Sequence, residues 1–432
     1  MNARLTLTFA VGLPLFVASC ANFRKLGRDL RLLDDEYRIS GIIDQTEKQS
    51  APVKAFVVEW DRAKNQVHSA DLLELTDGGA FAFMVKSPLN QYIAAHADSN
   101  RDGRYQQGEP FWMHRDYSGQ AQPVALSADD RVAKVRGSLS ASETPPQPML
   151  DAIKTALKGR DVSSYITNQG IRFALGEKAD LDDPQFAATR GEDGLWTPAT
   201  FAMKGGFGIY FLERYDPAKI PVIFVHGAAG SPQDWRYAME RIDRDIYQPW
   251  FFVYPSGLRL DAAATSLNKG IEQLHGRYGF KRLHVAAHSM GGLVARRFIQ
   301  MNVIDGGHDY IRTFVSYSSP WGGHEAAAMG VKYAPEVVPS WRDMAKGSEF
   351  LDHLFDKRLK GRVNHHLFYS HKATKSRILP PENDGTVSVA SQTRKEAVND
   401  AVGVRGFDED HLSILSSKEA LLAGKRALEA SP

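Results

Sequence analysis

An apolar segment that passes through a serine into a helix-forming segment constrains the fold of this chain more than any other feature. Leu283–Ala287 has the composition of a buried strand, and Gly292–Met301 has that of a helix. Ser289 lies between them, with the small residues Ala287 and Gly291 two positions before and after it. In so tight a strand-to-helix turn a larger flanking side chain would collide with neighbouring backbone. The segment therefore predicts a serine hydroxyl that projects from the end of a strand.

The sequence on either side of this turn alternates between strand-like and helix-like segments. With 432 residues the chain is long enough for two or three domains. The alternation predicts an α/β domain over residues 151–432, built on a doubly wound, mostly parallel sheet. The expected strands are Gly208–Leu212, Val222–Val225, Trp250–Tyr254, Leu283–Ala287, Thr313–Tyr317 and His366–Ser370, and the longer helix-sized segments are Ala262–Tyr278 and Gly292–Met301.

Residues 36–135 have a different pattern, in which short strand-like runs are separated by turn residues. The alternation within Ala80–Val85 and the lack of a long helical period indicate a small all-β sandwich rather than a parallel sheet. Residues 136–150 are rich in Ser and Pro and predict a linker between the two domains. The expected strands of the sandwich are Ile39–Ile43, Val53–Trp60, Leu72–Leu75, Ala80–Val85 and Gln91–Ala97.

The charge balance and the cysteine count exclude several classes of protein. The chain has 53 Lys and Arg against 51 Asp and Glu, and a net charge of +2 is too small for a dedicated nucleic-acid binder. No nucleic acid is therefore expected as a partner. The single cysteine, Cys20, excludes an intrachain disulfide framework and a cysteine-based zinc site.

The segment around Ser289 resembles the nucleophile elbow of the α/β-hydrolase family. The family pattern is G-x-S-x-G, and Ala287 stands in place of its first glycine. Pro221–Ser231, an apolar run that ends in a loop of small residues, resembles the oxyanion loop of lipases and esterases. The resemblance implies an α/β-hydrolase fold, with the N–H groups of Ala228 and Met290 as donors to a developing oxyanion.

Two later loops resemble the acid loop and the histidine loop of the same family. Asn383–Val387 has the sequence N-D-G-T-V, and Asp410 and His411 precede the last helix-like segment. The resemblance implies a triad of Ser289, Asp384 and His411, in which His411 is the base and Asp384 orients it. Asp410 is a rival acid, although sequence neighbours on a loop usually point apart.

These motifs imply a serine carboxylic ester hydrolase that works through an acyl-enzyme and needs no cofactor for catalysis. The residues from about 321 to 365 lie where the family carries its lid, and their apolar and aromatic side chains suit an ester or lipid substrate. An ordinary helical hairpin is the alternative interpretation. Ser319–His324 and Pro339–Met344 are similar to lipases related to the inositol-deacylase type. An acyltransferase with the same triad and a non-catalytic binding scaffold are the alternative functions.

A loop in the first domain fits the calcium-binding pattern D-x-[DN]-x-[DN]-G-x5-E. The pattern spans twelve residues, which suits a hard cation with oxygen ligands in a structural role. A hairpin loop of the same polar residues without a metal is the alternative. The candidate ligands are the side chains of Asp98, Asn100, Asp102 and Glu109 and the backbone carbonyl of Arg104.

The first twenty residues have the pattern of a targeting segment. Leu5–Ser19 is apolar, follows Arg4, and is shorter than the about 20 residues that a membrane-spanning helix needs. The sequence V-A-S-C that ends at Cys20 resembles the lipobox of bacterial lipoproteins, which implies a signal peptide over 1–20 and a lipid chain that anchors Cys20 to a membrane. The expected location is the bacterial cell envelope, and Asn22 favours the outer membrane by its resemblance to Gram-negative lipoproteins. An uncleaved anchor and an ordinary cleaved signal are the alternatives.

Overall fold

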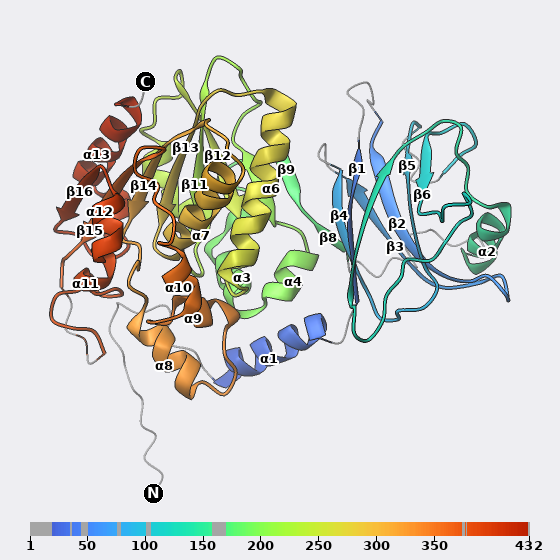
Figure 1. Ribbon diagram of the computed structural model, residues 1–432, viewed down its shortest axis with the longest axis horizontal. Coiled ribbons are helices and arrows are strands. Elements are labelled where there is room, and N and C mark those ends of the chain that lie inside the picture. The colour runs from blue at the N-terminus through green and yellow to red at the C-terminus, as the bar shows by residue number, and fades with distance from the viewer. Residues whose placement is uncertain are drawn as a thin grey trace, which may run out of the picture.

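The computed structural model describes residues 20–34, 37–44, 51–75, 79–100, 105–157, 170–373, 376 and 378–430. Figure 1 shows two lobes, an all-β lobe and a larger lobe in which helices cover a central sheet. The expected signal segment before Cys20 lies outside the described residues. Within the described ranges no helix has the length and apolar character needed to cross a membrane.

The all-β lobe is a sandwich of two four-stranded sheets, as the sequence predicts. Ile39, Phe83 and Ile93 are fully buried between the sheets, and Phe81 and Phe83 lie on the inner face of their strand, as the alternation there requires. One sheet has the order β7-β1-β4-β8 and the other β3-β2-β5-β6. The strands are β1 (Tyr37–Asp44), β2 (Val53–Asp61), β3 (Gln66–Leu75), β4 (Ala80–Val85), β5 (Gln91–Ala97), β6 (Phe111–Met113), β7 (Val132–Ser138) and β8 (Gly170–Arg172).

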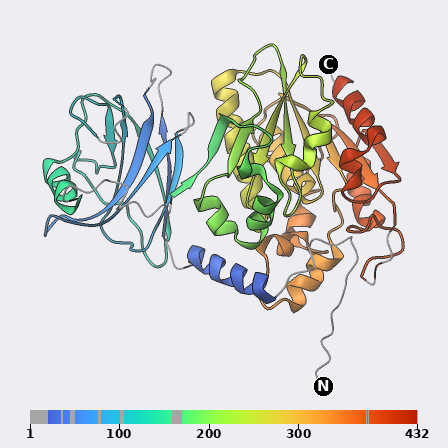
Figure 2. The same cartoon turned by 180° about the vertical axis from the view of Figure 1, so that it is seen from behind.

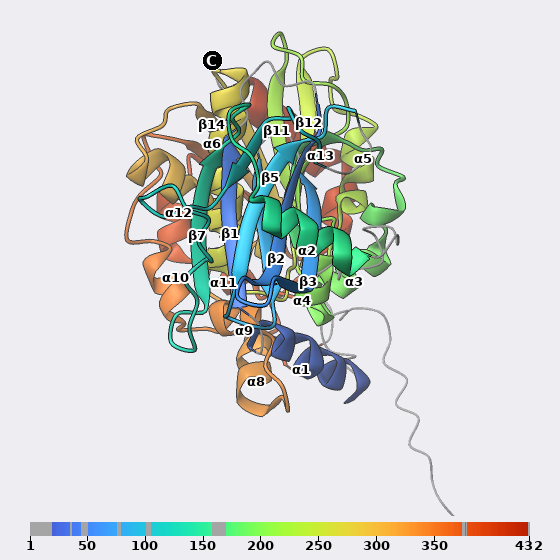
Figure 3. The same ribbon diagram turned by 90° about the vertical axis from the view of Figure 1, so that its right-hand side faces the viewer.

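The linker expected over residues 136–150 is not a free connection. These residues include the end of β7 and the start of α2 (Gln147–Leu157). Met149 and Ala152 of α2 are buried in a cluster with Trp60 and Tyr92, and Figure 3 shows α2 lying across the outer face of the sheet that contains β2 and β3. Later still, β8 pairs with β4, so the β lobe extends to Arg172. Most of the Pro and Ser residues that suggested a linker, from Ser140 to Pro146, form the loop before α2.

The larger lobe contains the predicted doubly wound sheet, with all six expected strands present. Its order is β16-β15-β14-β13-β11-β12-β10-β9, and every neighbouring pair is parallel except β10 and β12. The strands are β9 (Ala174–Lys178), β10 (Gly208–Phe211), β11 (Ile220–Val225), β12 (Tyr247–Val253), β13 (Leu283–His288), β14 (Ile311–Tyr317), β15 (Asn364–Ser370) and β16 (Gly403–Phe407).

Helices cover both faces of this sheet, as Figures 1 and 2 show. One face packs on α6 and α7 and the other on α13, because the strands carry apolar residues toward both sides. The helices are α3 (Ala188–Trp196), α4 (Pro198–Met203), α5 (Arg236–Met239), α6 (Leu260–Tyr278), α7 (Met290–Ile299), α8 (Glu325–Tyr333), α9 (Pro339–Met344), α10 (Glu349–His353), α11 (Val389–Gln392), α12 (Lys395–Asp400) and α13 (Lys418–Glu429). Short 3-10 segments lie at Pro184–Phe186, Pro232–Trp235 and Ser413–Ser416, and α7 continues as a π-helix over Gln300–Asp305.

The insertion after β14 consists of α8, α9 and α10. Trp341, Leu351 and Leu354 are buried in the main apolar core of the lobe, as in the helical-hairpin interpretation. Met329 and Tyr333 on α8 are instead exposed. Most of the apolar residues here therefore hold the insertion onto the lobe.

The first described helix, α1 (Cys20–Asp34), packs on the α/β lobe although the β lobe follows it in sequence (Figure 1). Leu26 is fully buried in the core of the α/β lobe. The carboxylate of Asp29 accepts hydrogen bonds from the backbone N–H of Ala199 at 2.7 Å and of Thr200 at 3.0 Å, and from the Thr200 hydroxyl. These N–H groups belong to the first turn of α4, where helical amides have no partner within the helix. Asp29 thus caps α4 from a distant part of the chain.

Asp29→Ala is expected to lower the free energy of unfolding of the α/β lobe by about 2 kcal/mol, because it leaves the amides of α4 unsatisfied in a buried site. Urea denaturation followed by tryptophan fluorescence measures this change. Arg28→Ala, on the exposed side of the same helix, is the control and should change stability by less than about 0.5 kcal/mol. Equal stability of the two variants would contradict the capping role.

Candidate active site

Ser289 occupies the tight turn between β13 and α7. Its backbone has φ 54° and ψ −129°, a conformation that is costly for a residue with a side chain and is found mainly at functional sites. The Ser289 N–H donates to the carbonyl of Tyr317 at 2.8 Å, which fixes the turn to β14. A β-carbon on Gly291 would overlap the backbone oxygens of Val225 and His226. Because α7 starts against the end of β11, the position two residues after the serine has no room for a side chain.

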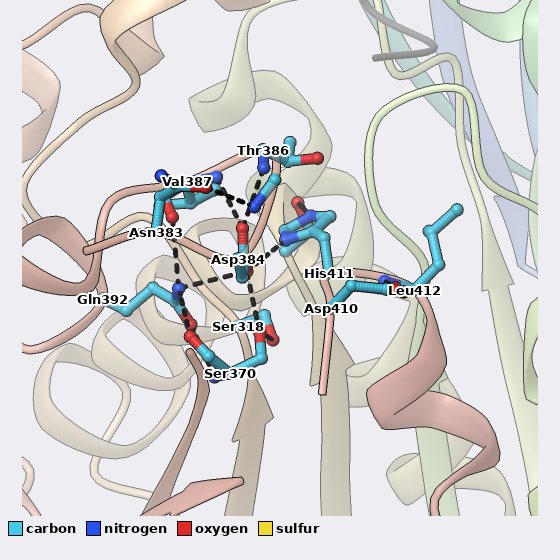
Figure 4. A network of polar contacts seen from close by, with 12 residues as sticks. Ser318, Ser370, Asn383, Asp384, Thr386, Val387, Gln392, Asp410, His411 and Leu412 are labelled. Carbon is cyan, nitrogen blue, oxygen red and sulfur yellow. Dashed lines mark hydrogen bonds and ion pairs between the residues drawn. The ribbon is translucent and has the colours of Figure 1, made fainter. Parts of the chain in front are cut away.

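His411 lies in hydrogen-bond contact with both Ser289 and Asp384. Its Nε2 is 2.8 Å from Ser289 Oγ, and its Nδ1 is 2.8 Å from Asp384 Oδ2. The His411 N–H also donates to the carbonyl of Asp384 at 2.9 Å, and the His411 carbonyl accepts from His288 Nε2 at 2.8 Å. Three residues that are far apart in the sequence thus form one connected set of polar contacts, part of which is drawn in Figure 4.

Asp384 is buried and both of its carboxylate oxygens are fully engaged. Oδ1 accepts from the N–H groups of Thr386 at 2.9 Å and Val387 at 2.7 Å. Oδ2 accepts from the Ser370 hydroxyl at 2.7 Å and from Gln392 Nε2 at 3.0 Å, in addition to His411 (Figure 4). Burial by itself raises the pKa of Asp384, but the charge interaction with His411 and these hydrogen bonds outweigh it and hold the pKa below its ordinary value.

An ionised Asp384 decides which nitrogen of His411 carries the proton. A carboxylate can only accept, so Nδ1 of His411 is the protonated nitrogen that donates to Asp384. The lone pair of Nε2 then faces the hydroxyl of Ser289. This arrangement can take a proton from the serine oxygen and hold the resulting positive charge on His411 beside Asp384.

The rival acid, Asp410, has a different set of contacts. Its Oδ1 accepts from the N–H groups of Leu412 at 3.0 Å and Ser413 at 2.8 Å. Figure 4 shows Asp410 directed toward Leu412, away from the side where Asp384 meets His411. Asp410 therefore builds the turn that leads into Ser413–Ser416.

Sequence reasoning missed three polar residues around Asp384. Ser370 and Gln392 donate to its carboxylate, and the hydroxyls of Ser318 and Ser370 lie 2.6 Å apart. Ser318 directly follows β14 and Ser370 is the last residue of β15. Polar residues at the carboxyl ends of neighbouring parallel strands meet at one edge of a sheet, and this rule was the available signal for the two serines. Gln392 lies on α11 instead.

The loop after β11 passes close to Ser289. A β-carbon on Gly227 would lie 3.0 Å from the Ser289 β-carbon, and the Ala229 N–H donates to Ser256 Oγ at 3.1 Å with Ala229 at φ 54°. Within the described part of the chain, the N–H groups of Ala228 and Met290 donate to no acceptor. Both amides are thus free to bind a group placed at Ser289.

Three further histidines surround the site, and burial makes them poor bases. It lowers the pKa of His226 and of His324 to about 4 and that of His288 to about 3. His226 Nδ1 donates to the Gly227 carbonyl at 2.8 Å, and its ring stacks on Tyr254 at 4.4 Å. Neutral rings at these positions hold the loops around Ser289 in place.

A fourth buried histidine, His284 of β13, is also expected to be neutral, and this can be tested. Neither of its ring nitrogens has a hydrogen-bond partner among the residues that the structure describes, and burial lowers its pKa to about 4. His284 is protonated near pH 6.5 in the unfolded chain but only near pH 4 in the folded chain. The free energy of unfolding therefore falls as the pH drops below 6.5. His284→Leu removes the effect, and its gain in free energy of unfolding should be about 2 kcal/mol larger at pH 5 than at pH 8. Urea denaturation at the two pH values measures it, and an equal gain at both would contradict a neutral His284.

The calcium pattern falls partly outside the described residues, which do not include Asp102 and Arg104. Glu109 accepts from the N–H groups of Ser99 at 2.7 Å and Gln106 at 2.9 Å, and Lys54 Nζ lies 3.6 Å from Asp98 Oδ2. Asn100 also has a partner. Over the described ranges no group of three or more His, Cys, Asp or Glu side chains could hold a metal. Calcium binding at this loop stays a prediction.

A serine in a strained turn after a central strand, and a histidine and an acid on loops after later strands of a mostly parallel sheet, define an α/β hydrolase. Residues 222–399 match the model of the alpha/beta hydrolase family, and the α/β lobe that contains them has the α/β-hydrolase fold.

The proteins that this chain resembles include a phospholipase and two lipases. Over 120 residues the chain is 32% identical to lysosomal phospholipase A and acyltransferase of Bos taurus, a match that covers 27% of this chain and 28% of the relative. A Bacillus licheniformis lipase in its mature form is 16% identical, with a TM-score of 0.38 over 50% of this chain and 94% of that one. Aspergillus fumigatus lipase B is 16% identical, with a TM-score of 0.40 over 52% of this chain and 56% of that one. The matched stretch thus spans less than a third of the curated relative.

Proposed function

We propose that this protein is a serine carboxylic ester hydrolase with Ser289 as nucleophile. The observation that carries the proposal is the unbroken contact from Ser289 Oγ through His411 to Asp384, with 2.8 Å at each step. Heavy-atom separations of this size are what proton transfer between a nucleophile and its base requires. The strained backbone of Ser289 supports the same conclusion, because such strain is retained where it positions a reacting group.

In the proposed mechanism Ser289 Oγ attacks the acyl carbonyl while its proton passes to His411 Nε2. Asp384 stabilises the positively charged imidazole, and the N–H groups of Ala228 and Met290 bind the negative oxygen of the tetrahedral intermediate. His411 then protonates the leaving alcohol, which departs and leaves an acyl ester on Ser289. A water molecule, deprotonated by His411, attacks this ester and releases the carboxylic acid.

Reaction with a fluorophosphonate probe tests whether the site is catalytic or only a binding scaffold. The probe forms a covalent bond with an activated serine, so labelling of Ser289, mapped by peptide mass spectrometry, is expected for the hydrolase. A folded protein that never reacts at Ser289 would favour the scaffold.

Acyl transfer to an alcohol is the second candidate, because the curated relative is by its name both a phospholipase A and an acyltransferase. The two reactions share every step up to the acyl-enzyme and differ in whether water or an alcohol removes the acyl group. Analysis of the products of a phospholipid substrate, with and without a long-chain alcohol, separates them. Free fatty acid as the main product in both cases would exclude transfer.

We also propose that the mature chain begins at a lipidated Cys20 and is tethered to the bacterial envelope, with the outer membrane favoured. The proposal rests on the sequence V-A-S-C and on the apolar segment before it. Mass spectrometry of the mature amino terminus tests it, and an unmodified Cys20 would overturn it.

A further inference from the structure

The solvent-facing side of α1 carries a row of exposed arginines. Arg24, Arg28 and Arg31 are exposed and follow one another at intervals of four and three residues, so they share one face of the helix. In the described part of the chain none of the three makes an ion pair or a side-chain hydrogen bond. Lys25, by contrast, pairs with Asp193 at 3.2 Å. Three cations are thus directed toward solvent with no counter-charge among the described residues.

This row of arginines has a fixed orientation relative to the active site. On the opposite side of α1, Leu26 and Asp29 are buried against the α/β lobe. Phe23 makes edge-on ring contacts with Trp196 at 5.6 Å and with Trp341 at 6.3 Å. Whatever the exposed face of α1 binds therefore also orients the α/β lobe.

The adjacent helix, α8, adds exposed apolar groups. Tyr333 is 70% exposed and Met329 is 40% exposed, whereas the neighbouring helix α9 is mostly buried. Gly27 of α1 lies against the half-buried Glu336, which follows α8, and Figures 1 and 2 both show α8 beside the start of α1. Arginines next to an exposed tyrosine and methionine are the combination that binds the interface of a lipid bilayer, where cations meet phosphates and apolar groups enter the headgroup region.

The surface formed by α1 and α8 lies beside the carboxyl ends of the strands, where the active site is also found. α8 follows the carboxyl end of β14, and α1 packs on α3 and α4 and, through Phe23, on α9. Ser289, Ser370 and the loops of Asp384 and His411 are also placed at the carboxyl ends of parallel strands. A surface bound at α1 and α8 would therefore adjoin the face where an ester must enter.

We propose that Arg24, Arg28 and Arg31 of α1, with Met329 and Tyr333 of α8, form a docking surface for a bilayer rich in anionic phosphate headgroups. Docking holds the active-site edge of the sheet against the membrane, so a lipid ester reaches Ser289 without first diffusing through water. This consequence rests on the proposed ester hydrolase, whereas the docking itself does not. Each arginine near an anionic surface strengthens binding about fivefold, so the three together contribute roughly a hundredfold.

Vesicle flotation tests the surface without the lipid anchor. The protein is the chain from residue 20 with Cys20→Ala, mixed at low ionic strength with vesicles of phosphatidylcholine alone or with an equal part of phosphatidylglycerol. Binding is expected only with phosphatidylglycerol and should weaken in high salt. The triple variant Arg24→Gln, Arg28→Gln, Arg31→Gln should bind roughly a hundredfold more weakly, and Tyr333→Ser should weaken binding further. Unchanged binding of the triple variant would overturn the proposal.

A matched control lies at the opposite edge of the same sheet. Arg282, Arg312 and Arg362 are exposed residues that precede or begin β13, β14 and β15, and Arg282→Gln, Arg312→Gln, Arg362→Gln removes the same charge. This variant should bind vesicles like the parent chain; an equal loss would show a nonspecific charge effect and overturn the proposal. Binding to double-stranded DNA as strong as to the vesicles would also overturn it.

A soluble-ester assay keeps the two proposals apart. Both triple variants should hydrolyse p-nitrophenyl acetate like the parent chain, because neither changes the active site. Vesicle binding by a chain without esterase activity would support the docking surface and refute only the proposed function. Full esterase activity without binding to anionic vesicles would refute only the docking surface.

Discussion

Ser289→Ala is expected to lower the turnover of p-nitrophenyl acetate by at least about 10⁴-fold while leaving the fold intact. Without the hydroxyl no acyl-enzyme can form, and only the oxyanion donors and substrate binding assist the residual reaction. The β-carbon is kept, so the strained turn at φ 54° does not change, and one hydrogen bond to His411 is lost. Steady-state kinetics and a thermal melt measure the two expectations.

Ser266→Ala is the matched control, because Ser266 is half-buried on α6 and its hydroxyl donates to the Ala262 carbonyl of its own helix. Its turnover should equal that of the parent chain. Wild-type turnover in the Ser289→Ala protein would remove Ser289 from the mechanism, whatever the fluorophosphonate probe labels.

Asp384→Asn is expected to lower kcat by about 10⁴-fold, whereas Asp410→Asn should change kcat less than about threefold. The amide nitrogen that replaces one carboxylate oxygen of Asp384 cannot accept a hydrogen bond from Nδ1, so His411 would present the wrong tautomer to Ser289. Asp410 binds the backbone of its own turn, a role that asparagine fills equally well. Pre-steady-state kinetics with p-nitrophenyl acetate compares the two variants.

The free energy of unfolding of the Asp384→Asn protein gives an independent check, because it should depend on pH in a definite direction. Folding lowers the pKa of Asp384, so its ionised form stabilises the protein above the ordinary pKa of 3.8, and this contribution is lost as the pH falls through the lowered pKa. Asp384→Asn should therefore be destabilised most near neutral pH.

A large loss of kcat in Asp410→Asn with little change in Asp384→Asn would reverse the assignment of the acid.

Short-range patterns predicted the secondary structure of the α/β lobe well. Each expected strand lies within or overlaps an observed one, because a strand buried on both faces must be apolar throughout and the turns that bound it need small or polar residues. The α/β fold and the sandwich were predictable for this reason. Gly291 is a different case, because the collision that its missing side chain avoids is with the backbone oxygens of Val225 and His226, which lie far away in the sequence.

The linker expected over 136–150 shows where such patterns fail. Its Pro and Ser residues are typical of a linker, but Met149 and Ala152 are held against Trp60 and Tyr92 by apolar contacts with strands far away in the sequence. Whether a short helix packs on a sheet depends on the surface it meets, and no local pattern contains that surface.

By itself the sequence predicted the serine turn at Ser289 and the order of strands and helices, because each depends on residues within a few positions of one another. The loops of Asp384 and His411 were predicted only through their resemblance to a family, and Asp410 stayed a rival acid. Only the tertiary structure decided that Ser370 and Gln392 hold Asp384, that Asp29 of α1 caps α4, and that the exposed arginines of α1 face solvent without a partner among the described residues. The Asp29 contact joins residues that lie 170 positions apart in the sequence, and Ser370 and Gln392 reach Asp384 from the end of β15 and from α11. The free energy of such contacts comes from burial and hydrogen bonding in the folded core, so it leaves no periodic trace along the chain.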